Sequence, residues 1–192
     1  MDVVAAAFQA VPRVGFLPAQ ARPQAAHDGP IDIGHGQTNS QPRTVANMLT
    51  LLQVRRGQRV LDVGAGSGWT TALLAYLTGS TGQVCGVEAV PELVEVGQAN
   101  LAATGQPWAS ITQSSEEVLG LPDEAPFERI LVSAEARTLP EQLAAQLGDG
   151  GRMVIPVAGT MLVVVRRGSE LDVSRHGSYR FVPLRSGQTE TS

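Results

Sequence analysis

The sequence predicts an α/β fold with a mostly parallel sheet of seven strands and helices on both faces. Short apolar strands alternate with helical segments through the middle of the chain, which is typical of right-handed βαβ units. The last two strands have no helix between them, so we expect an antiparallel hairpin at one edge of the sheet. A glycine-rich loop joins one strand to a helix, as in open α/β sheets that bind ligands at that junction.

The first forty residues are expected to be largely irregular. Residues 5–10 form a short helix that stops before Pro12, because the residue before a proline disfavours helical angles. Three prolines and several glycines then break the chain as far as Gly36. A loop of this length inside a compact domain is typical of a functional cover.

Regular elements begin at residue 42. Residues 42–53 show the helical period, with Val45, Met48, Leu49 and Leu52 on one stripe. A closing hairpin is expected from strands at 160–166 and 179–183, joined by a polar turn near 168–177. Between them we expect strands at 59–63, 83–88, 109–112, 129–132 and 153–157, and helices at 70–77, 91–103 and 140–147.

Composition excludes several classes of function. The 14 basic and 18 acidic residues give a net charge of −4, which disfavours a nucleic-acid partner because such binding needs a basic face. All 14 basic residues are arginine, so neither a P-loop lysine nor a Schiff-base mechanism is available. The lone Cys85 lies in an apolar run and is expected to be a buried small hydrophobe, not a disulfide or zinc ligand.

The apolar runs are short. None reaches the roughly 18 residues of a membrane span, so we expect no membrane partner. The apolar stretch near the N-terminus has no basic residues before it, so we expect a cytoplasmic protein without a secretory signal. We also expect a monomer.

The most informative segment reads VLDVGAGSGW and runs from Val60 to Trp69. A strand ends, three alternating glycines follow, and a helix begins. Glycine lets the chain turn sharply and lets a ligand lie against the backbone, and a helix N-terminus adds free N–H groups. Glu88 ends the next strand, where an acid accepts hydrogen bonds from ribose hydroxyls in doubly wound folds.

The spacing Gly64, Gly66 and Gly68 narrows the ligand class. It differs from the G-x-G-x-x-G of nicotinamide enzymes, and Ser67 is not centred as in a nucleophile elbow. A tight turn that holds no ligand is the structural alternative. The pattern is similar to motif I of the class I S-adenosylmethionine-dependent methyltransferases, and this resemblance implies that Asp62 lies near the methionine amino group of that cofactor.

A second unusual segment, IDIGHGQTNSQP at residues 31–42, precedes the first long helix. Ser40 or Gln41 could cap that helix, since Pro42 suits its first position. Capping does not account for the two glycines, Gln37 and Thr38 that accompany them.

This segment resembles the G-x-G-Q-T-x-S-x-P signature of the protein-L-isoaspartate O-methyltransferases. The resemblance covers nearly the whole chain, including AFQAVPR at 7–13, VPEL at 90–93, APFERILV at 125–132, GGRMVIPV at 150–157 and FVPL at 181–184. It implies a Rossmann-like class I methyltransferase fold and transfer of a methyl group from S-adenosylmethionine to L-isoaspartyl or D-aspartyl carboxylates of damaged peptides and proteins. It also implies that Ser40 is the active-site serine, with Thr38 beside it.

The resemblance further implies which residues hold the cofactor. They come from the signature loop, motif I and the ends of the next two strands: Gln37, Asp62, Gly64, Ala65, Gly66, Ser67, Gly68, Glu88, Ala89, Glu116 and Glu117. No set of metal ligands is present in the sequence, since His27 and Asp28 have no further partners. Within one domain, we expect an irregular substrate and cofactor cover (1–41), a cofactor-binding core (42–157), C-terminal strands (158–185) and a frayed tail (186–192).

The sequence departs from the family pattern at five positions. Glu116 keeps the acid that contacts adenine in the family, but Glu117 replaces a glycine. Asn39 stands where the family has an apolar residue, and Arg43 follows the proline of the signature. Glu135 and Arg137 replace small residues and a proline after the fourth strand. These positions leave open a related carboxyl methyltransferase that acts on an aspartate of a modified peptide or on another small acid.

Methyl transfer to a carboxylate needs few catalytic side chains. A carboxylate with a pKa of about 4 is ionised at neutral pH, so it attacks a sulfonium methyl without a general base. The enzyme has to align the reacting atoms and exclude water, and the Ser40 hydroxyl can hold one carboxylate oxygen. A non-catalytic module that binds an adenosine ligand is the alternative of another class. Trp69 is expected either in the core or against the cofactor.

Overall fold

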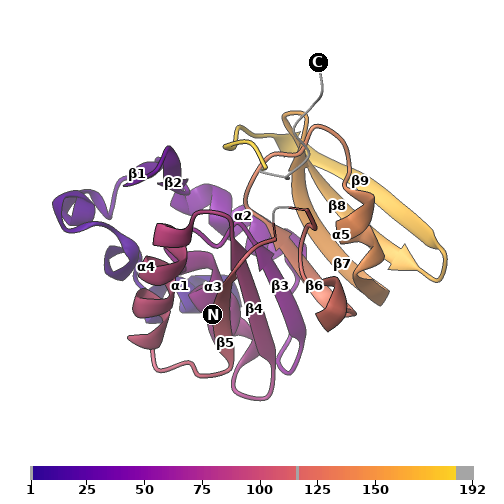
Figure 1. Ribbon diagram of the computed structural model, residues 1–192, viewed down its shortest axis with the longest axis horizontal. Helices are drawn as coiled ribbons and strands as arrows, with labels where there is room; N and C mark the ends of the chain where they lie inside the picture. Colours follow the sequence, from indigo (N-terminus) through magenta and orange to yellow (C-terminus); the bar gives the residue numbers. More distant parts are fainter. Residues whose placement is uncertain (1, 116, 185–192) are drawn as a thin grey trace.

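In the computed structural model, which describes residues 2–115 and 117–184, the chain forms one seven-stranded sheet and a small two-stranded sheet. The large sheet has the order β5-β4-β3-β6-β7-β8-β9 (Figure 1). Strands β5 to β7 in this order are parallel, and β8 and β9 extend the sheet in antiparallel fashion. The predicted fold class is confirmed. The strands are β3 (Arg59–Val63), β4 (Gln83–Glu88), β5 (Ala109–Gln113), β6 (Phe127–Val132), β7 (Leu147–Val157), β8 (Thr160–Arg167) and β9 (Glu170–Ser178).

Helices cover the two faces of the sheet unevenly. Four helices contribute to one apolar cluster with Val60, Val84 and Leu131 of the central strands. The opposite cluster contains Leu61, Ile130 and the short helix α5 with neighbouring loop residues. Successive residues of a strand point to opposite faces, which is why Val60 and Leu61 belong to different clusters. The helices are α1 (Val3–Ala10), α2 (Pro42–Leu52), α3 (Trp69–Thr78), α4 (Pro91–Ala102) and α5 (Glu141–Ala145).

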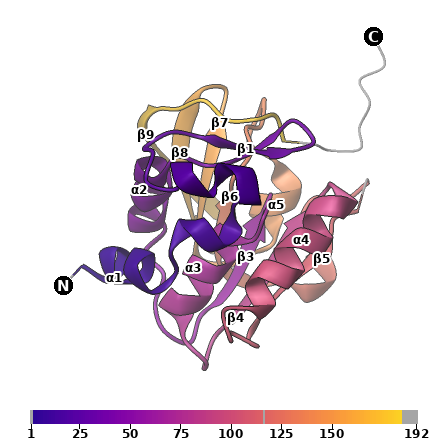
Figure 2. The same cartoon turned by 90° about the vertical axis from the view of Figure 1, so that its left-hand side faces the viewer.

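The N-terminal segment is more ordered than expected. It contains α1, two 3-10 helices, η1 (Arg13–Phe16) and η2 (Ala19–Gln24), and a hairpin of β1 (Ile31–Gly34) and β2 (Gln37–Asn39). Figure 2 shows it on the helical face, between α2 and α4. A third apolar cluster holds the segment there. This packing explains why the segment is ordered although its prolines and glycines predicted an irregular chain. That cluster joins Leu17, Ala21, Ile31 and Ile33 to Val90 and Leu93.

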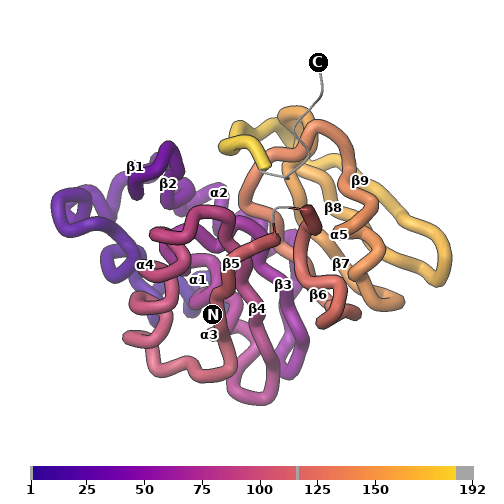
Figure 3. Tube along the Cα trace, viewed as in Figure 1, coloured from indigo at the N-terminus to yellow at the C-terminus, as the bar shows by residue number. Residues whose placement is uncertain are grey.

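The closing hairpin differs from the prediction in its second strand. Residues 170–178, expected as a turn, form β9, and the turn is short and centred near Gly168. Every residue of β9 is exposed, and only Leu171 and Val173 give it a brief apolar alternation, which is too short to identify the strand from the sequence. The predicted strand at 179–183 is instead a segment that leaves β9 and returns toward the middle of the sheet (Figure 3).

Two predictions fall outside the described residues: the contact of Glu116 with adenine and the frayed tail at 186–192. None of the helices in the described ranges combines the length and the apolar character needed to cross a membrane.

Candidate active site

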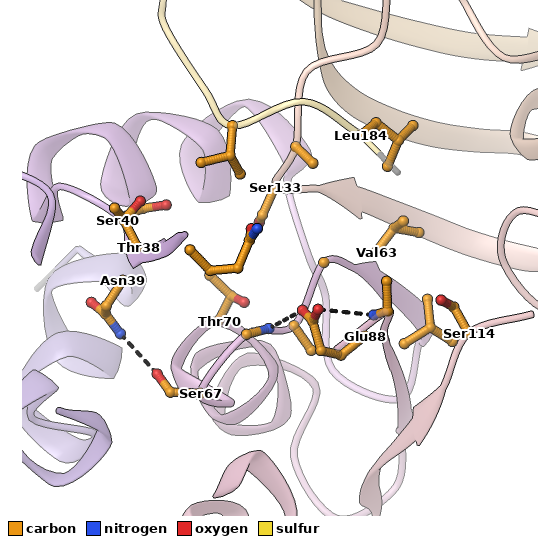
Figure 4. A pocket seen from close by; sticks show the side chains of 18 of the residues that line it. Thr38, Asn39, Ser40, Val63, Ser67, Thr70, Glu88, Ser114, Ser133 and Leu184 are labelled. Atoms are coloured by element: carbon orange, nitrogen blue, oxygen red, sulfur yellow. Dashed lines mark hydrogen bonds between the residues drawn. The ribbon is translucent and has the colours of Figure 1, made fainter. Parts of the chain in front are cut away.

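One pocket lies where the parallel strands β3, β4, β5 and β6 end. This is the edge at which open α/β sheets bind their ligands. Three segments from elsewhere in the chain complete it: residues 37–40, 119–120 and 182–184. Figure 4 shows side chains from these elements around a common space. Its lining residues include Gln37, Thr38, Asn39, Ser40, Gly64, Ala65, Gly66, Ser67, Trp69, Thr70, Glu88, Ala89, Ser114, Leu119, Gly120, Ser133, Ala134, Val182, Pro183 and Leu184.

The glycine loop turns sharply out of β3 into α3. Gly64, Gly66 and Gly68 all have positive φ angles (82°, 53° and 92°), a conformation that favours glycine. A Cβ atom on Gly68 would lie 2.9 Å from the carbonyl oxygen of Gly97, so α4 packs closely against the loop only because position 68 lacks a side chain. The loop therefore presents backbone to the pocket.

Glu88, at the end of β4, holds this loop in place. Its Oε2 accepts a hydrogen bond from the Gly66 N–H at 2.8 Å. Its Oε1 accepts from the N–H groups of Ala89 (2.8 Å) and Val90 (3.0 Å). A carboxylate offers roughly four acceptor positions, so Glu88 retains capacity for one donor from a ligand in the pocket.

Asp62 lies beneath the loop and does not line the pocket. It is fully buried, and its Oδ2 accepts hydrogen bonds from the hydroxyls of Thr70 and Thr71, each at 2.7 Å. Its Oδ1 has no partner among the described residues. Burial raises the pKa of Asp62 to about 6, against the effect of the two hydroxyls. Asp62 therefore fixes the first turn of α3.

The loop at residues 37–40 forms the opposite wall. Asn39 is buried, Ser40 is half-buried and Thr38 is exposed, in keeping with the alternation of an extended segment. Figure 4 shows Thr38 and Ser40 on one side of this segment and Asn39 directed toward Ser67. No hydrogen bond to the Ser40 hydroxyl is found among the described residues, so this hydroxyl is available to a ligand.

The capping interpretation is confirmed in position and wrong in mechanism. Gln41 occupies the N-cap position of α2 and Pro42 follows it, but neither the Gln41 side chain nor that of Ser40 bonds the first-turn N–H groups. The carboxylate of Asp28 does so instead, because its Oδ1 accepts from the Arg43 N–H at 3.1 Å. Asp28 also pairs with the Arg43 guanidinium at 2.9 Å, and the Arg43 backbone hydrogen bond lowers the pKa of Asp28. Arg43 is thus engaged outside the pocket.

A buried arginine shapes the 37–40 loop from behind. Arg13 has only 5% of its surface exposed, and its Nε donates to the Asn39 Oδ1 at 2.7 Å. Its terminal nitrogens donate to four backbone carbonyls at 2.8–2.9 Å, two in this loop and two in the segment before β1, which sets the path of the chain up to Ser40. These carbonyls belong to His27, Gly29, Asn39 and Ser40.

Trp69 belongs mainly to the core, the first of its two expected positions. Only 3% of it is exposed, its Nε1 donates to the Val11 carbonyl at 3.0 Å, and its ring meets Phe8 edge to face at 5.2 Å. The Arg13 guanidinium lies 5.6 Å from its ring centroid. These contacts anchor the N-terminal segment to the start of α3, and Trp69 also lines the pocket.

Glu135 holds the third wall of the pocket, which residues 182–184 form. Its Oε1 accepts from the Gly159 N–H at 3.1 Å and its Oε2 from the Phe181 N–H at 3.4 Å. Its backbone pairs with the same segment, since its N–H donates to Val182 and its carbonyl accepts from Leu184, both at 2.7 Å. Glu135 thus secures residues 182–184 at the pocket. Arg137 lies exposed in the loop after β6.

The fourth wall, beyond β5, is held by a buried glutamine. Gln146 accepts from the Leu121 N–H at 2.8 Å and donates to the Leu119 carbonyl at 2.7 Å, so the 119–121 turn is fixed beside the pocket. Ser114 is tied to β4 through its N–H, which donates to the Glu88 carbonyl at 2.9 Å. Glu117 lies in an exposed turn, where its N–H bonds the Ser115 hydroxyl, and does not line the pocket.

The structure thus brings most of the predicted site residues together. Gly68 and Asp62 lie beneath the lining and Glu117 outside it. Sequence reasoning missed Ser114 and Ser133, although each directly follows a parallel strand and could have been inferred from that position. Residues at the pocket from the predicted set are Gln37, Thr38, Ser40, Gly64, Ala65, Gly66, Ser67, Glu88 and Ala89.

The pocket offers hydrogen-bonding groups and little acid–base machinery. No group of three potential metal ligands occurs among the described residues. Cys85 is buried on the sheet, as predicted, and burial raises the pKa of its thiol to about 11. The arrangement can bind a ligand along the glycine loop and can orient a second, anionic ligand at Thr38 and Ser40.

Comparisons with known proteins agree with this geometry. The family model for protein-L-isoaspartate(D-aspartate) O-methyltransferase matches residues 1–189. The protein-L-isoaspartate O-methyltransferase of Methanothrix thermoacetophila is 44% identical over 183 residues, which cover 94% of this chain and 87% of that protein. The protein of the same name from Methanopyrus kandleri is also 44% identical, over 94% of this chain and 82% of that protein.

Two solved structures are similar as well. One, a protein-L-isoaspartate O-methyltransferase, has a TM-score of 0.88 at 24% identity over 97% of this chain. This chain spans 62% of that longer one, and the likeness shows the fold. The other, from Plasmodium falciparum and assigned to the same enzyme class, contains S-adenosyl-L-homocysteine. Its TM-score is 0.83 at 25% identity, over 96% of this chain and 90% of that one.

Proposed function

Because the chain belongs to the protein-L-isoaspartate(D-aspartate) O-methyltransferase family, we propose that it methylates the free carboxylate of L-isoaspartyl or D-aspartyl residues in damaged proteins, as the first step of their repair. It is an S-adenosylmethionine-dependent protein carboxyl methyltransferase. The observation that carries the assignment of its site is the meeting of two loops at one pocket. The glycine loop with Glu88 forms one wall, and the Thr38 and Ser40 hydroxyls lie on the wall opposite it.

S-adenosylmethionine fits the groups along the glycine loop. When bound, it supplies an electrophilic methyl group on a sulfonium sulfur. The backbone of Gly64 and Gly66 permits close approach, and Glu88 has acceptor capacity left for a ribose hydroxyl. We assign the adenine to the end bounded by Ser114 and Leu119, beyond the end of β4.

The acceptor carboxylate belongs at Ser40 and Thr38. Ser40 donates its hydroxyl proton in a hydrogen bond to one carboxylate oxygen, which leaves the other oxygen free to attack the methyl group. Thr38 supports the same anion. No residue needs to remove a proton, because an ordinary carboxyl group with a pKa of about 4 is already ionised. Residues 182–184 line the pocket and help to exclude water.

The Ser40 hydroxyl gives the sharpest test of the acceptor assignment. Ser40→Ala should lower methyl transfer to an isoaspartyl peptide by roughly ten- to several-hundred-fold, as expected when one hydrogen bond to a charged group is lost. Cofactor affinity, measured by calorimetry, should change little, because Ser40 lies on the opposite wall. Ser110→Ala, on an exposed position of β5, is the matched control.

A second substitution tests whether Ser40 orients the acceptor carboxylate or only packs in the loop. Ser40→Asp places a negative charge where the acceptor anion is proposed to bind, so activity should fall further than in Ser40→Ala. A stable Ser40→Asp variant with full activity on isoaspartyl peptide would overturn the role of Ser40.

We also propose that the protein is a monomer, so light scattering should show a single species with the mass of one chain.

A further inference from the structure

We propose that the buried hydrogen bond between Asn39 and Ser67 transmits the state of the cofactor loop to the acceptor hydroxyls, which makes Asn39 a positioning residue of the reaction. The inference rests on the proposed function, since that function assigns the glycine loop to the cofactor and Thr38 and Ser40 to the acceptor. It concerns a position at which the resemblance implies an apolar residue.

The bond joins the two functional walls directly. The Asn39 Nδ2 donates to the Ser67 Oγ at 3.2 Å, and these residues are 28 positions apart in the sequence (Figure 4). Asn39 and Ser67 have only 5% and 3% of their surfaces exposed. A polar contact that is shielded from water is not readily exchanged for hydrogen bonds to solvent, so a displacement of one wall acts on the other.

Arg13 determines which way the Asn39 amide faces. A guanidinium only donates hydrogen bonds, so the oxygen of the amide must face the Arg13 Nε, 2.7 Å away. The NH₂ group is then directed to Ser67, whose hydroxyl accepts. On the other side, the Ser67 carbonyl accepts from the Asn100 Nδ2 of α4 at 2.9 Å. Asn39 is thus held at a fixed orientation between two anchored partners.

Asn39 lies between the two residues that carry the proposed acceptor-binding hydroxyls, so its hydrogen bond to Ser67 affects their position. Its neighbours on either side are Thr38 and Ser40, so fixing its side chain fixes the backbone that carries both hydroxyls. A ligand that orders residues 64–68 should therefore also order residues 37–40. By linkage, an acceptor that orders residues 37–40 should raise the affinity for the cofactor by the same factor. An apolar residue at position 39 cannot make this bond.

Hydrogen exchange tests the transmission without an acceptor. In the wild-type protein, saturating S-adenosylhomocysteine should slow amide exchange in residues 37–40 by roughly two- to tenfold, the effect of one net hydrogen bond. In Ser67→Ala, at a concentration that calorimetry shows to be saturating, this slowing should be absent at Asn39 and Ser40, and Gln37 is left out of the comparison because it is itself expected to contact the cofactor. Asn39→Leu should behave in the same way, and Ser67→Ala decides alone if Asn39→Leu fails to fold.

Asn100→Ala is the matched control, since it removes the other hydrogen bond to Ser67 and leaves the link to Asn39. It should retain the slowing of residues 37–40. The inference is overturned if the wild-type segment does not respond to the ligand, if Ser67→Ala responds as fully as the wild type, or if Asn100→Ala loses the response equally.

Kinetics provide the second readout. Ser67→Ala should lower kcat at saturating cofactor and peptide, which a loss of stability alone would not do for the folded fraction. Asn39→Asp should retain most of kcat, because a carboxylate accepts from both Arg13 and the Ser67 hydroxyl. A wild-type enzyme that methylates no isoaspartyl peptide would contradict the proposed function, and the exchange experiment would still decide the role of Asn39.

Discussion

Replacing Glu88 by glutamine changes one atom in the group that supports the glycine loop. The glutamine can keep its carbonyl oxygen on the N–H groups of Ala89 and Val90. Its NH₂ group then faces the Gly66 N–H, so a donor meets a donor where the Glu88 Oε2 now accepts at 2.8 Å. Loss of a hydrogen bond to a charged group lowers the free energy of unfolding by about 1.5–3 kcal/mol.

This magnitude can be measured in two ways. At about 2–4 °C per kcal/mol for a chain of this size, the Tm of Glu88→Gln should fall by about 3–12 °C in calorimetry. The affinity for S-adenosylhomocysteine should fall roughly ten- to hundredfold, because the ribose loses a charged acceptor and the loop loses its support. Glu95→Gln makes the same chemical change on an exposed face of α4 and is the control. Changes below 1 °C and twofold in Glu88→Gln would refute this account of the loop.

Two further predictions concern Glu135 and Asp62. Glu135→Ala removes the carboxylate that accepts hydrogen bonds from the Gly159 and Phe181 N–H groups. The kcat/KM for the isoaspartyl peptide should therefore fall roughly three- to thirtyfold, while cofactor affinity changes less than twofold. An unchanged kcat/KM in steady-state assays would contradict the role of residues 182–184. The pKa of Asp62 is about 6 in the folded chain and 3.8 ordinarily, so the wild type should lose up to about 3 kcal/mol of stability between pH 4 and pH 7, and this stability is fully present below pH 4. Asp62→Asn should not show this loss in urea unfolding at the two pH values, and parallel pH curves would contradict it.

The sequence predicted what depends on local pattern. The strand at 59–63 and the α2 stripe of Val45, Met48, Leu49 and Leu52 follow from apolar period, and the structure buries all four of these side chains. The glycine loop and Glu88 were predictable because both lie at fixed places in a βαβ unit. Hydroxyls at Ser114 and Ser133 follow the same rule and were within reach of it.

What the sequence concealed depends on contacts between distant residues. The order of the N-terminal segment comes from Arg13 and an apolar cluster with α4, neither of which has a local signature. Strand β9 pairs with β8 along one edge and buries none of its side chains, and its many polar residues made it resemble a turn. The roles of Asn39 and Glu135 could not be inferred either, because their partners lie 28 and 46 residues away.

The central claim is tested most directly by methyl transfer to matched peptides. Three peptides of one sequence, with L-aspartate, L-isoaspartate or D-aspartate at one position, are incubated with the protein and methyl-labelled S-adenosylmethionine. The account predicts base-labile label on the L-isoaspartyl peptide, less or equal label on the D-aspartyl peptide, and none on the L-aspartyl peptide. Label on the L-aspartyl peptide equal to that on the L-isoaspartyl peptide, or no label on any of the three, would contradict it.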